Sequence, residues 1–249
     1  MDSLMISVAS GMRARMESLD MLANNLANAA TAGYKSDREM YGLYVAQEAL
    51  DPALAGESPL PSTLPVVEQR WTDFGQGSLT STGNSLDLAL GTKGFFAVEG
   101  PDGPLYTRNG SFRISAAGTL TTQEGYAVRG VDGQPIRTQS TAPLEISSDG
   151  MVRQEGVVLG QIAVAGAEKG TLEKAGRNYY RAADPGAPPA PSSDVEVHQG
   201  KLEASNVNAP ETAVRLVNIL RQFEMLQKAA MLSGEMGRRA VEEVARVSQ

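Results

Sequence analysis

Residues Ala23 to Lys35 read Ala-Asn-Asn-Leu-Ala-Asn-Ala-Ala-Thr-Ala-Gly-Tyr-Lys. Three asparagines, Asn24, Asn25 and Asn28, fall within a segment that otherwise has the composition of an apolar helix. Asparagine costs about half a kcal/mol of helix stability relative to alanine at each position. The three amides therefore need a physical reason, and that reason determines how the N-terminal part of the chain packs.

A helix is predicted to lead into this stretch, over about residues 3–32. Apolar residues recur there at spacings of three and four, which places them on one stripe of an amphipathic helix; they include Leu4, Val8, Met12, Met16, Leu19, Leu22 and Leu26. Gly33 is predicted to cap this helix in the left-handed conformation.

A second, longer helix is predicted from Ala209 to Val247. Asn208 is its expected N-cap, Pro210 fits the first turn, and Glu211 lies where the acid of a capping box belongs. Apolar and small residues then alternate in steps of three and four over about five heptads. We call this stripe the C-terminal seam: Leu216, Ile219, Phe223, Leu226, Ala230, Ser233, Gly237, Ala240, Val244 and Val247.

The middle of the chain, about residues 71–197, is predicted to be all-β. Glycine-containing turns separate short strand-like runs, among them 86–90, 95–98, 105–108, 111–115, 126–128 and 156–164. Turn signals at this frequency are typical of a sandwich, barrel or meander. Asn109-Gly110 is predicted to form the type I′ turn of a hairpin, because both residues tolerate positive φ.

The predicted fold class is therefore α+β, with N- and C-terminal amphipathic helices that pair as a coiled-coil domain and an all-β domain inserted between them. The expected divisions are an N-terminal helix at 1–33, an extended linker with a proline-rich tract at 34–70, a β domain at 71–200 and a C-terminal helix at 201–249. Both helices carry more apolar surface than they can cover on each other, so packing between subunits is expected.

Composition argues against several functions. The net charge is −7 with no basic run, which argues against binding nucleic acid. The absence of cysteine excludes disulfides and thiolate metal sites. The one histidine, His198, has no catalytic partner nearby in sequence, which favours a structural residue over a general base or metal ligand. We therefore expect no enzyme activity, no cofactor, no metal and no small-molecule substrate.

The N-terminus does not resemble a cleavable signal. It begins with an acid at Asp2, has arginines at 13 and 15, and lacks a continuous apolar region. No stretch is long and apolar enough to be predicted as a membrane span. The sequence thus indicates either a cytoplasmic protein or export by a route that reads no cleavable signal.

Four blocks resemble the axial rod and hook proteins of the bacterial flagellar basal body. They are the Ala23–Lys35 stretch, the run FGQGSLTSTGNSLDLALGTKGFFAV, the run YTRNGSFRISAAGTLTTQEGYAVRG, and the run GKLEASNVNAPETAVRLVNILRQFEMLQK. They occur in the family's order and cover most of the chain. Within the family, the chain's length and the run Arg221 to Met225 are most similar to proximal-rod members, with distal-rod members second.

The resemblance implies a structural subunit that polymerises helically into the hollow drive shaft of the basal body. It implies contacts with itself and other axial proteins, passage through the flagellar type III export apparatus without signal cleavage, and a place in the periplasmic rod. The implied subunit-interface residues are Asn24, Asn25, Leu26, Asn28, Thr31, Gly33, Tyr34, Asn206, Asn208, Leu216, Ile219, Phe223, Leu226, Ala230 and Gly237.

Two interpretations of the asparagines follow. Buried amides can fix the register between packed helices, or the three residues can simply belong to a polar, fraying helix end; the resemblance favours the first. A distal-rod or hook-type subunit is the alternative assignment. From other classes, a secreted glycan-binding or enzymatic β domain with oligomerising helices, and an export adaptor or assembly chaperone, remain alternatives.

Overall fold

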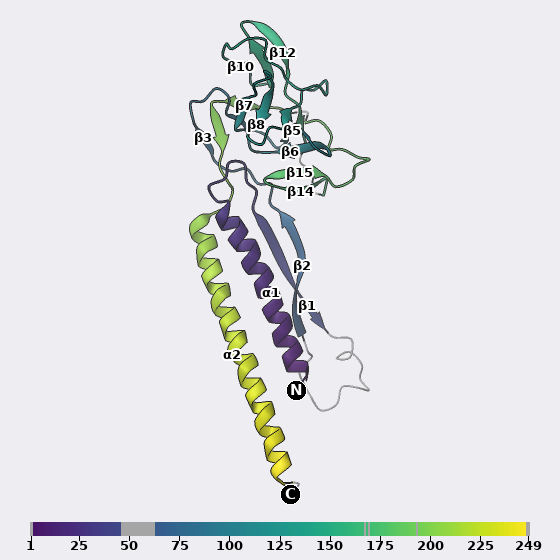
Figure 1. Ribbon diagram of the computed structural model, residues 1–249, viewed down its shortest axis with the longest axis vertical. Coiled ribbons are helices and arrows are strands. Elements are labelled where there is room, and N and C mark those ends of the chain that lie inside the picture. The colour runs from purple at the N-terminus through teal and green to yellow at the C-terminus, as the bar shows by residue number, and fades with distance from the viewer. Residues whose placement is uncertain (1, 46–62, 167, 169, 193, 248–249) are drawn as a thin grey trace. The chain divides into compact units, whose positions relative to one another are not determined.

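The computed structural model describes residues 2–45, 63–166, 168, 170–192 and 194–247 (Figure 1). It confirms the α+β class, with a helix towards each end of the chain and a β-rich region between them. The chain forms two compact units: residues 1–27, 37–73 and 208–249, here called the helical unit, and residues 28–36 and 74–207, here called the β unit. In the described part of the chain, neither helix is long and apolar enough to cross a membrane.

The two helices are α1 (Asp2–Ala27) and α2 (Ala209–Val247). The strands in chain order are β1 (Asp37–Val45), β2 (Thr63–Thr72), β3 (Leu79–Ser81), β4 (Leu88–Leu90), β5 (Phe95–Gly100), β6 (Gly103–Thr107), β7 (Phe112–Ile114), β8 (Leu120–Thr122), β9 (Ala127–Val128), β10 (Glu145–Ile146), β11 (Met151–Gln154), β12 (Val157–Gln161), β13 (Val164–Ala165), β14 (Leu172–Gly176), β15 (Tyr179–Ala182), β16 (Val197–Gln199) and β17 (Lys201–Glu203).

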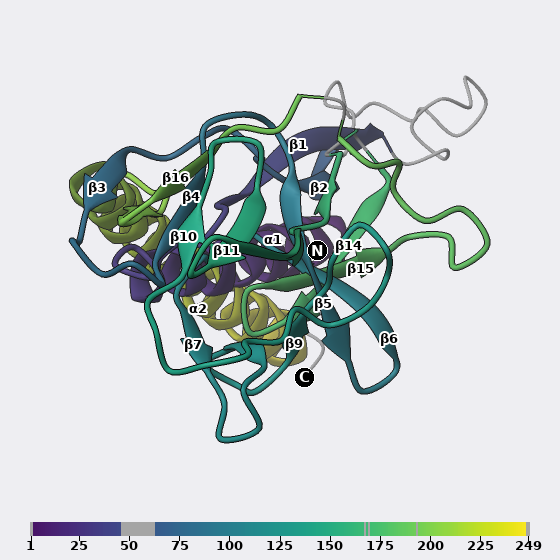
Figure 2. The same ribbon diagram turned by 90° about the horizontal axis from the view of Figure 1, so that it is seen from above.

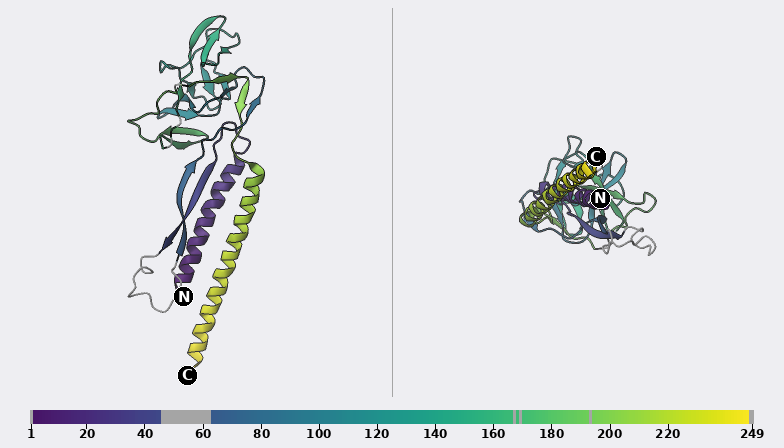
Figure 3. Two further views of the ribbon diagram at one scale, coloured as in Figure 1. Left: turned by 180° about the vertical axis from the view of Figure 1, so that it is seen from behind. Right: turned by 90° about the horizontal axis from the view of Figure 1, so that it is seen from below.

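In the helical unit, α1 and α2 lie side by side and run in opposite directions, and α2 continues past the N-terminal end of α1 (Figure 3). The α2 bounds agree with the predicted helix, and Asn208 is its N-cap, since the Glu211 amide donates to Asn208 Oδ1 at 3.4 Å. The described side chains of the C-terminal seam from Leu216 to Gly237 are half-buried. Their spacing therefore matches the face of α2 that is sheltered in this unit.

The predicted cap at Gly33 is wrong, although its backbone conformation is left-handed with φ of 67°. The α1 helix already ends at Ala27, and residues 28–34 form turns. In these turns the Thr31 amide donates to the Asn28 carbonyl at 3.1 Å, and the Tyr34 amide donates to the Thr31 carbonyl at 3.2 Å. Local turn bonds therefore take over from helical bonds several residues before the glycine.

Strands β1 and β2 pair antiparallel, with a bulge between Met40 and Tyr41, in the region of the predicted 34–70 linker, and β2 continues to Thr72. Of the predicted proline-rich tract 51–65, residues 51–62 lie outside the described residues, and residues 63–65 begin β2. At the end of the ribbon, Thr72 Oγ1 donates to Asp37 Oδ1 at 2.9 Å, and Arg38 pairs with Asp73 at 2.9 Å. These contacts hold the first residues of β1 against the last residues of β2.

The β unit is built around one large sheet, in the order β14-β15-β6-β5-β9-β8-β7, with β13 also paired to β5. Figure 2 labels β14, β15, β6, β5, β9 and β7 of this sheet. A three-stranded sheet, β10-β11-β12, and two strand pairs, β16 with β4 and β17 with β3, complete the unit. Each of these two pairs joins a strand near the C-terminal end of the β unit's sequence to a strand near its N-terminal end. Residues 197–203 therefore close the unit around segments that precede them by more than a hundred residues.

The strand β5 is buried on both faces, which explains its continuous apolar sequence. Phe96 and Val98 contribute to the larger core, whereas the alternate residues Phe95 and Ala97 contribute to the smaller one. The period-2 alternation of a strand thus places one short run in two separate cores. The predicted strand-like runs that contain β4, β5, β6, β7, β9 and β12 are confirmed as strands.

The predicted hairpin at Asn109-Gly110 is wrong. Strand β6 pairs with β5 and β15, and β7 pairs with β8, so no hairpin joins β6 to β7. Instead, Asn109 Oδ1 accepts a bond from the Ser111 amide at 3.1 Å, and the Gly110 carbonyl accepts one from the Leu88 amide at 3.0 Å. A Cβ at Gly110 would lie 1.7 Å from the Leu88 carbonyl oxygen, so close packing requires this glycine.

Replacement of Phe112 by alanine should lower the free energy of unfolding of the β unit by about 3–5 kcal/mol, because it empties a core site. The Phe112 ring is 2% exposed and packs edge-on against Phe96 with ring centroids 5.2 Å apart. Ile114, on the same strand and 37% exposed, is the matched control, and Ile114→Ala should cost less than about 1 kcal/mol. Urea denaturation compares the two; equal losses would contradict this placement of the core.

Candidate functional site

Three charged side chains from distant parts of the sequence meet inside the β unit. Lys35 follows the first turns, Arg108 follows β6, and Glu203 ends β17. The Lys35 and Glu203 side chains are fully buried, and the Arg108 side chain is 3% exposed. We call this group the junction cluster, because it joins the segment after α1 to the segment before α2.

Glu203 is the centre of the junction cluster. Its Oε1 accepts bonds from Lys35 Nζ at 2.5 Å and from the Gly77 amide at 2.8 Å. Its Oε2 lies 2.9 Å from Arg108 Nε, as an ion pair without the alignment of a hydrogen bond. Lys35 Nζ also donates to the Gly75 carbonyl at 2.7 Å. One carboxylate thus contacts three separate segments of the chain.

The cluster holds two cationic side chains for one carboxylate. Burial lowers the pKa of the Arg108 guanidinium, and the Glu203 carboxylate opposes that shift. Arg108 Nη1 has no hydrogen-bond partner among the described residues. Loss of one member of a buried ion pair typically costs about 3–5 kcal/mol, because the remaining charge is left uncompensated. Glu203 is therefore the member whose loss should be most damaging.

Two glycines allow the backbone segments to approach the cluster. A Cβ on Gly33 would lie 2.4 Å from the carbonyl carbon of Arg108, and the Gly33 amide donates to the Glu203 carbonyl at 2.7 Å. A Cβ on Gly77 would lie 2.0 Å from the Ala204 carbonyl oxygen. Gly33 is thus required for a close backbone crossing as well as for its positive φ.

Two asparagine amides tie neighbouring segments together by using both their oxygen and their nitrogen. In the helical unit, Asn25 Nδ2 donates to the Asp37 carbonyl at 2.8 Å, and Asn25 Oδ1 accepts from the Asp37 amide at 2.9 Å. In the β unit, Asn206 Oδ1 accepts from the Ser36 amide at 2.7 Å, and Asn206 Nδ2 donates to the Gly75 carbonyl at 3.1 Å. Each side-chain amide thus bonds to a backbone donor and a backbone acceptor, as the backbone of a neighbouring strand would.

The structure separates the predicted interface residues into three groups. Asn25, Gly33 and Tyr34 are buried within the chain, and Lys174 Nζ lies 4.8 Å from the centroid of the Tyr34 ring. A second group is half-buried, whereas Asn24 and Asn208 are exposed; the half-buried members are Leu26, Asn28, Thr31, Asn206, Leu216, Ile219, Phe223, Leu226, Ala230 and Gly237. Thr31 Oγ1 lies 3.2 Å from Asn28 Oδ1.

The described residues contain one histidine and a few hollows, which bear on metal binding and small-molecule binding. No group of three or more His, Asp or Glu side chains there is placed to hold a metal ion. His198 Nε2 lies 3.4 Å from Glu196 Oε1, and both side chains are partly exposed. A hollow of about 480 Å³ in the β unit is lined mainly by apolar residues; Tyr106 and Arg129 are the titratable groups among its described lining residues.

The sequence reasoning did not single out Lys35, Arg108 or Glu203. Each lies within one of the blocks quoted above, in GYK, YTRNG and GKLEASN. A lone charged residue beside a glycine or on a short strand is ordinarily a solvated side chain. Only the chain topology, which pairs β17 with β3, reveals that these three charges are buried together.

Replacement of Gly33 by alanine should destabilise the β unit by at least about 2 kcal/mol more than replacement of Gly83. Gly83 is the matched control, since its φ is 72° but no atom lies within 4 Å of the place that a Cβ would occupy. Gly83→Ala should therefore cost only the roughly 1–2 kcal/mol of a left-handed alanine. Urea denaturation tests this; similar costs for the two variants would refute the close crossing at Arg108.

Replacement of Asn25 by alanine should lower the free energy of unfolding of the helical unit by about 1–3 kcal/mol, because both Asp37 backbone groups lose their partner. Asp20 is exposed on the same helix, and Asp20→Ala should change the stability by less than about 0.5 kcal/mol. The chain's one tryptophan, Trp71, lies on β2 and reports on this unit by fluorescence. An Asn25→Ala variant as stable as the parent would exclude this role.

Comparison with known proteins finds family models that match the three parts of the chain that contribute Lys35, Arg108 and Glu203. Residues 7–35 match the family model for flagella basal body rod protein, residues 89–154 match that for the flagellar hook protein FlgE/F/G D1 domain, and residues 198–242 match that for the flagellar basal body rod FlgEFG protein C-terminal region. The first and last matches contain Lys35 and Glu203, and the middle match contains Arg108.

Similar whole proteins carry the same description. The chain is 35% identical to the flagellar basal-body rod protein FlgF of Caulobacter vibrioides over 251 residues, which cover 99% of both chains. It is 31% identical to FlgF of Rhizobium meliloti over 83% of each chain. It is 30% identical to the rod protein FlgG of Bacillus subtilis over 91% of this chain and 93% of that protein. The chain therefore belongs to the flagellar basal-body rod protein family, and it is a structural subunit of the rod, proximal or distal.

Proposed function

We propose that this rod subunit assembles through its helical unit, with α1 and α2 pairing as a coiled coil and contacting the same helices of neighbouring subunits. In this arrangement the β unit forms the outer layer of a hollow, helically built shaft. The observation that carries the proposal is the apolar surface that α2 leaves exposed in a single chain.

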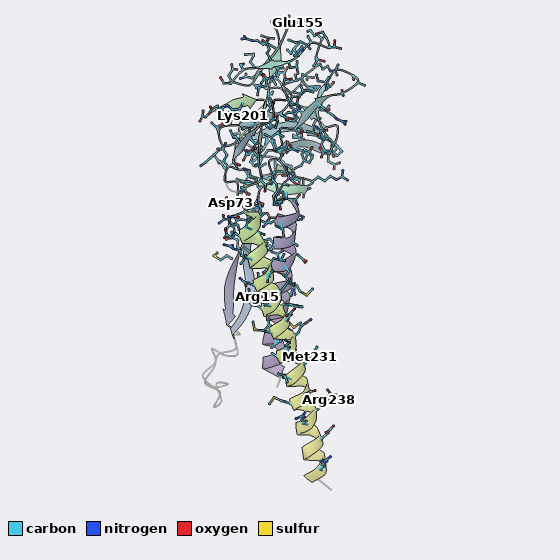
Figure 4. The ribbon with its side chains drawn as sticks, turned by 90° about the vertical axis from the view of Figure 1, so that its left-hand side faces the viewer. Arg15, Asp73, Glu155, Lys201, Met231 and Arg238 are labelled. Carbon is cyan, nitrogen blue, oxygen red and sulfur yellow. The ribbon has the colours of Figure 1, made fainter. Side chains whose placement is uncertain are left out.

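That surface is extensive. Val214, Met225, Leu232 and Met236 are each more than 60% exposed. At 100° per residue they fall within roughly 40° of one another, on the side of α2 away from the C-terminal seam. Met231, which Figure 4 labels on the same helix, is 70% exposed but lies about 100° from Leu232 around the helix, outside this stripe. A monomer that exposes so much apolar surface in one stripe gains free energy when a partner covers it.

The C-terminal seam supports a second contact on the opposite side of α2. Its residues from Ala230 to Gly237 are small, so the backbone of a facing helix can approach closely there. A helix with apolar residues on two sides fits a bundle in which each helix has several neighbours. This supports packing of α2 against α1 on one side and against another subunit on the other.

The asparagines acquire different roles in this proposal. The Asn25 amide is bonded to Asp37 of its own chain, so its effect is on the helical unit itself. Asn24 is exposed one position earlier on α1. We therefore assign the register-setting role between subunits to Asn24, where a directional amide would favour one alignment among many similar ones.

The finer assignments within the family are also part of this proposal. We infer a proximal-rod subunit, because the chain's length and the run Arg221 to Met225 are most similar to proximal-rod members. Its partners are other copies and other axial proteins, and its location is the periplasmic part of the basal body. We infer export through the flagellar type III apparatus, without signal cleavage, from the family to which the chain belongs.

A glycan-binding or enzymatic β domain has less support. The hollow in the β unit has a volume within the range of small-molecule sites. However, its described lining offers a tyrosine and an arginine as titratable groups, and Arg129 pairs with Glu99 at 3.3 Å. The Tyr106 pKa is raised by burial, so that this phenol keeps its proton at neutral pH. This hollow lacks a general base among its described lining residues, whereas another hollow in the β unit, of about 680 Å³, is lined in part by Asp102 and Glu173.

Replacement of Leu232 by glutamate should prevent assembly without unfolding the monomer, because the side chain is 61% exposed. The added charge would have to be buried at the subunit contact, at a cost of several kcal/mol. The control is Gln227→Glu, which adds the same charge at an exposed polar position of α2. Far-UV circular dichroism of the monomers, sedimentation, negative-stain microscopy and motility in complemented cells measure the effect.

The proposal expects normal monomer spectra for both variants, with loss of polymers and motility for Leu232→Glu alone. Normal motility with Leu232→Glu would exclude this face of α2 from the subunit contact. Loss of assembly in both variants to the same degree would show that net charge, and not the apolar stripe, governs it.

A further inference from the structure

We propose that the junction cluster is an electrostatic latch, through which the C-terminal segment 197–207 controls whether the N-terminal segment 28–36 is anchored in the β unit. Glu203 closes the latch by entering between Lys35 and Arg108. The proposal concerns the β unit of a single chain and does not depend on how subunits assemble.

The first step concerns the charge that the site would carry without the Glu203 carboxylate. Lys35 and Arg108 are almost completely excluded from solvent in the closed unit, and both pair with Glu203. Without this carboxylate, one ammonium and one guanidinium charge would have to leave water without the anion that pairs with both of them. Hydration of both cations would then be strongly favoured over burial, and the segment that carries Lys35 would stay out of the unit.

The second step concerns the residues that supply the hydrogen bonds to the backbone of the N-terminal segment. The Gly33 amide donates to the Glu203 carbonyl at 2.7 Å, and the Ser36 amide donates to Asn206 Oδ1 at 2.7 Å. The Tyr34 carbonyl accepts from the Asn206 backbone amide at 3.3 Å. Residues 203–206 thus bond to the backbone on both sides of Lys35, so the C-terminal segment supplies the charge and the backbone partners together.

Other parts of the β unit also touch the N-terminal segment, but they do not replace the carboxylate. Asn178 Nδ2 donates to the Ala32 carbonyl at 2.9 Å. Lys174 Nζ lies 4.8 Å from the centroid of the Tyr34 ring and 3.4 Å from the Lys35 carbonyl oxygen. These residues contribute an amide and a further cation. The anion that balances the site comes from β17, 168 residues after Lys35.

The latch therefore makes the two ends of the β unit depend on each other. A chain whose C-terminal segment is absent, displaced or not yet folded should leave residues 28–36 unanchored.

Hydrogen exchange of the full-length protein tests the latch. The substitution Glu203→Gln keeps the size and an oxygen acceptor for the Gly77 amide but removes the charge. It should raise the exchange rates of the amides at Gly33, Ser36 and Gly77 on the order of a hundredfold. Amides in the middle of β5 and β6 should keep their rates, since their bonds belong to the large sheet.

A second variant separates charge from hydrogen bonding. In Glu203→Gln with Lys35→Met, one uncompensated cation is gone, so exchange at Ser36 and Gly77 should slow at least tenfold relative to Glu203→Gln alone. The control is Glu99→Gln, which removes a carboxylate from an ion pair that is partly exposed and should leave exchange at these amides unchanged.

Rates in Glu203→Gln within threefold of the parent would overturn the latch. So would a double variant that exchanges as fast as Glu203→Gln, because hydrogen bonding rather than charge would then hold the segment. If Glu203→Gln alone does not fold, recovery of the folded β unit in the double variant supports the latch, and its failure to recover overturns it.

Discussion

Burial of one carboxylate between two cations is the constraint on which the β unit depends. Glu203 bonds to Lys35 and the Gly77 amide and pairs with Arg108, and these partners come from three separate segments of the chain. A buried ion pair seldom adds much net stability compared with apolar residues of the same size. Its value here is specificity, since a hydrophobic contact would tolerate displaced arrangements of these segments, whereas an unpaired buried charge does not.

The same division between specificity and bulk stability recurs in the two asparagines. Asn25 and Asn206 each use both ends of one amide to bond two neighbouring segments. Their hydrogen bonds contribute modest free energy, but each would leave buried backbone groups unsatisfied if the segments shifted. The cost of asparagine inside the α1 sequence is thus offset within the chain at Asn25. For Asn24 and Asn28, a role in setting the register between subunits stays a prediction, and so does the alternative that they belong to a polar helix end.

Sequence reasoning succeeded where a repeating pattern carried the information. The bounds of α2 followed from its N-cap and its seam, and most strand-like runs of the β unit are strands. It failed where one residue type serves two purposes. Asn109-Gly110 has the composition of a tight hairpin turn, but Gly110 is needed for contact with the Leu88 carbonyl. Gly33 has the positive φ of a helix cap, yet it lies in a backbone crossing at Arg108.

The pairing of β1 with β2 was not predicted, because the proline-rich tract in that region indicated a linker or surface loop. The junction cluster was missed because only long-range pairing brings its members together.

The pairing of β17 with β3 also sets the speed at which the β unit can fold. Contacts such as that of Lys35 with Glu203 span 168 residues, and a chain must lose much conformational freedom before they form. Proteins dominated by distant contacts fold orders of magnitude more slowly than those with local ones. The α2 helix, by contrast, is stabilised by bonds between near neighbours and can form and melt within microseconds. The newly made chain should consequently spend a long interval with helical segments that come and go and a β region still open, a state compliant enough to be threaded through a narrow passage.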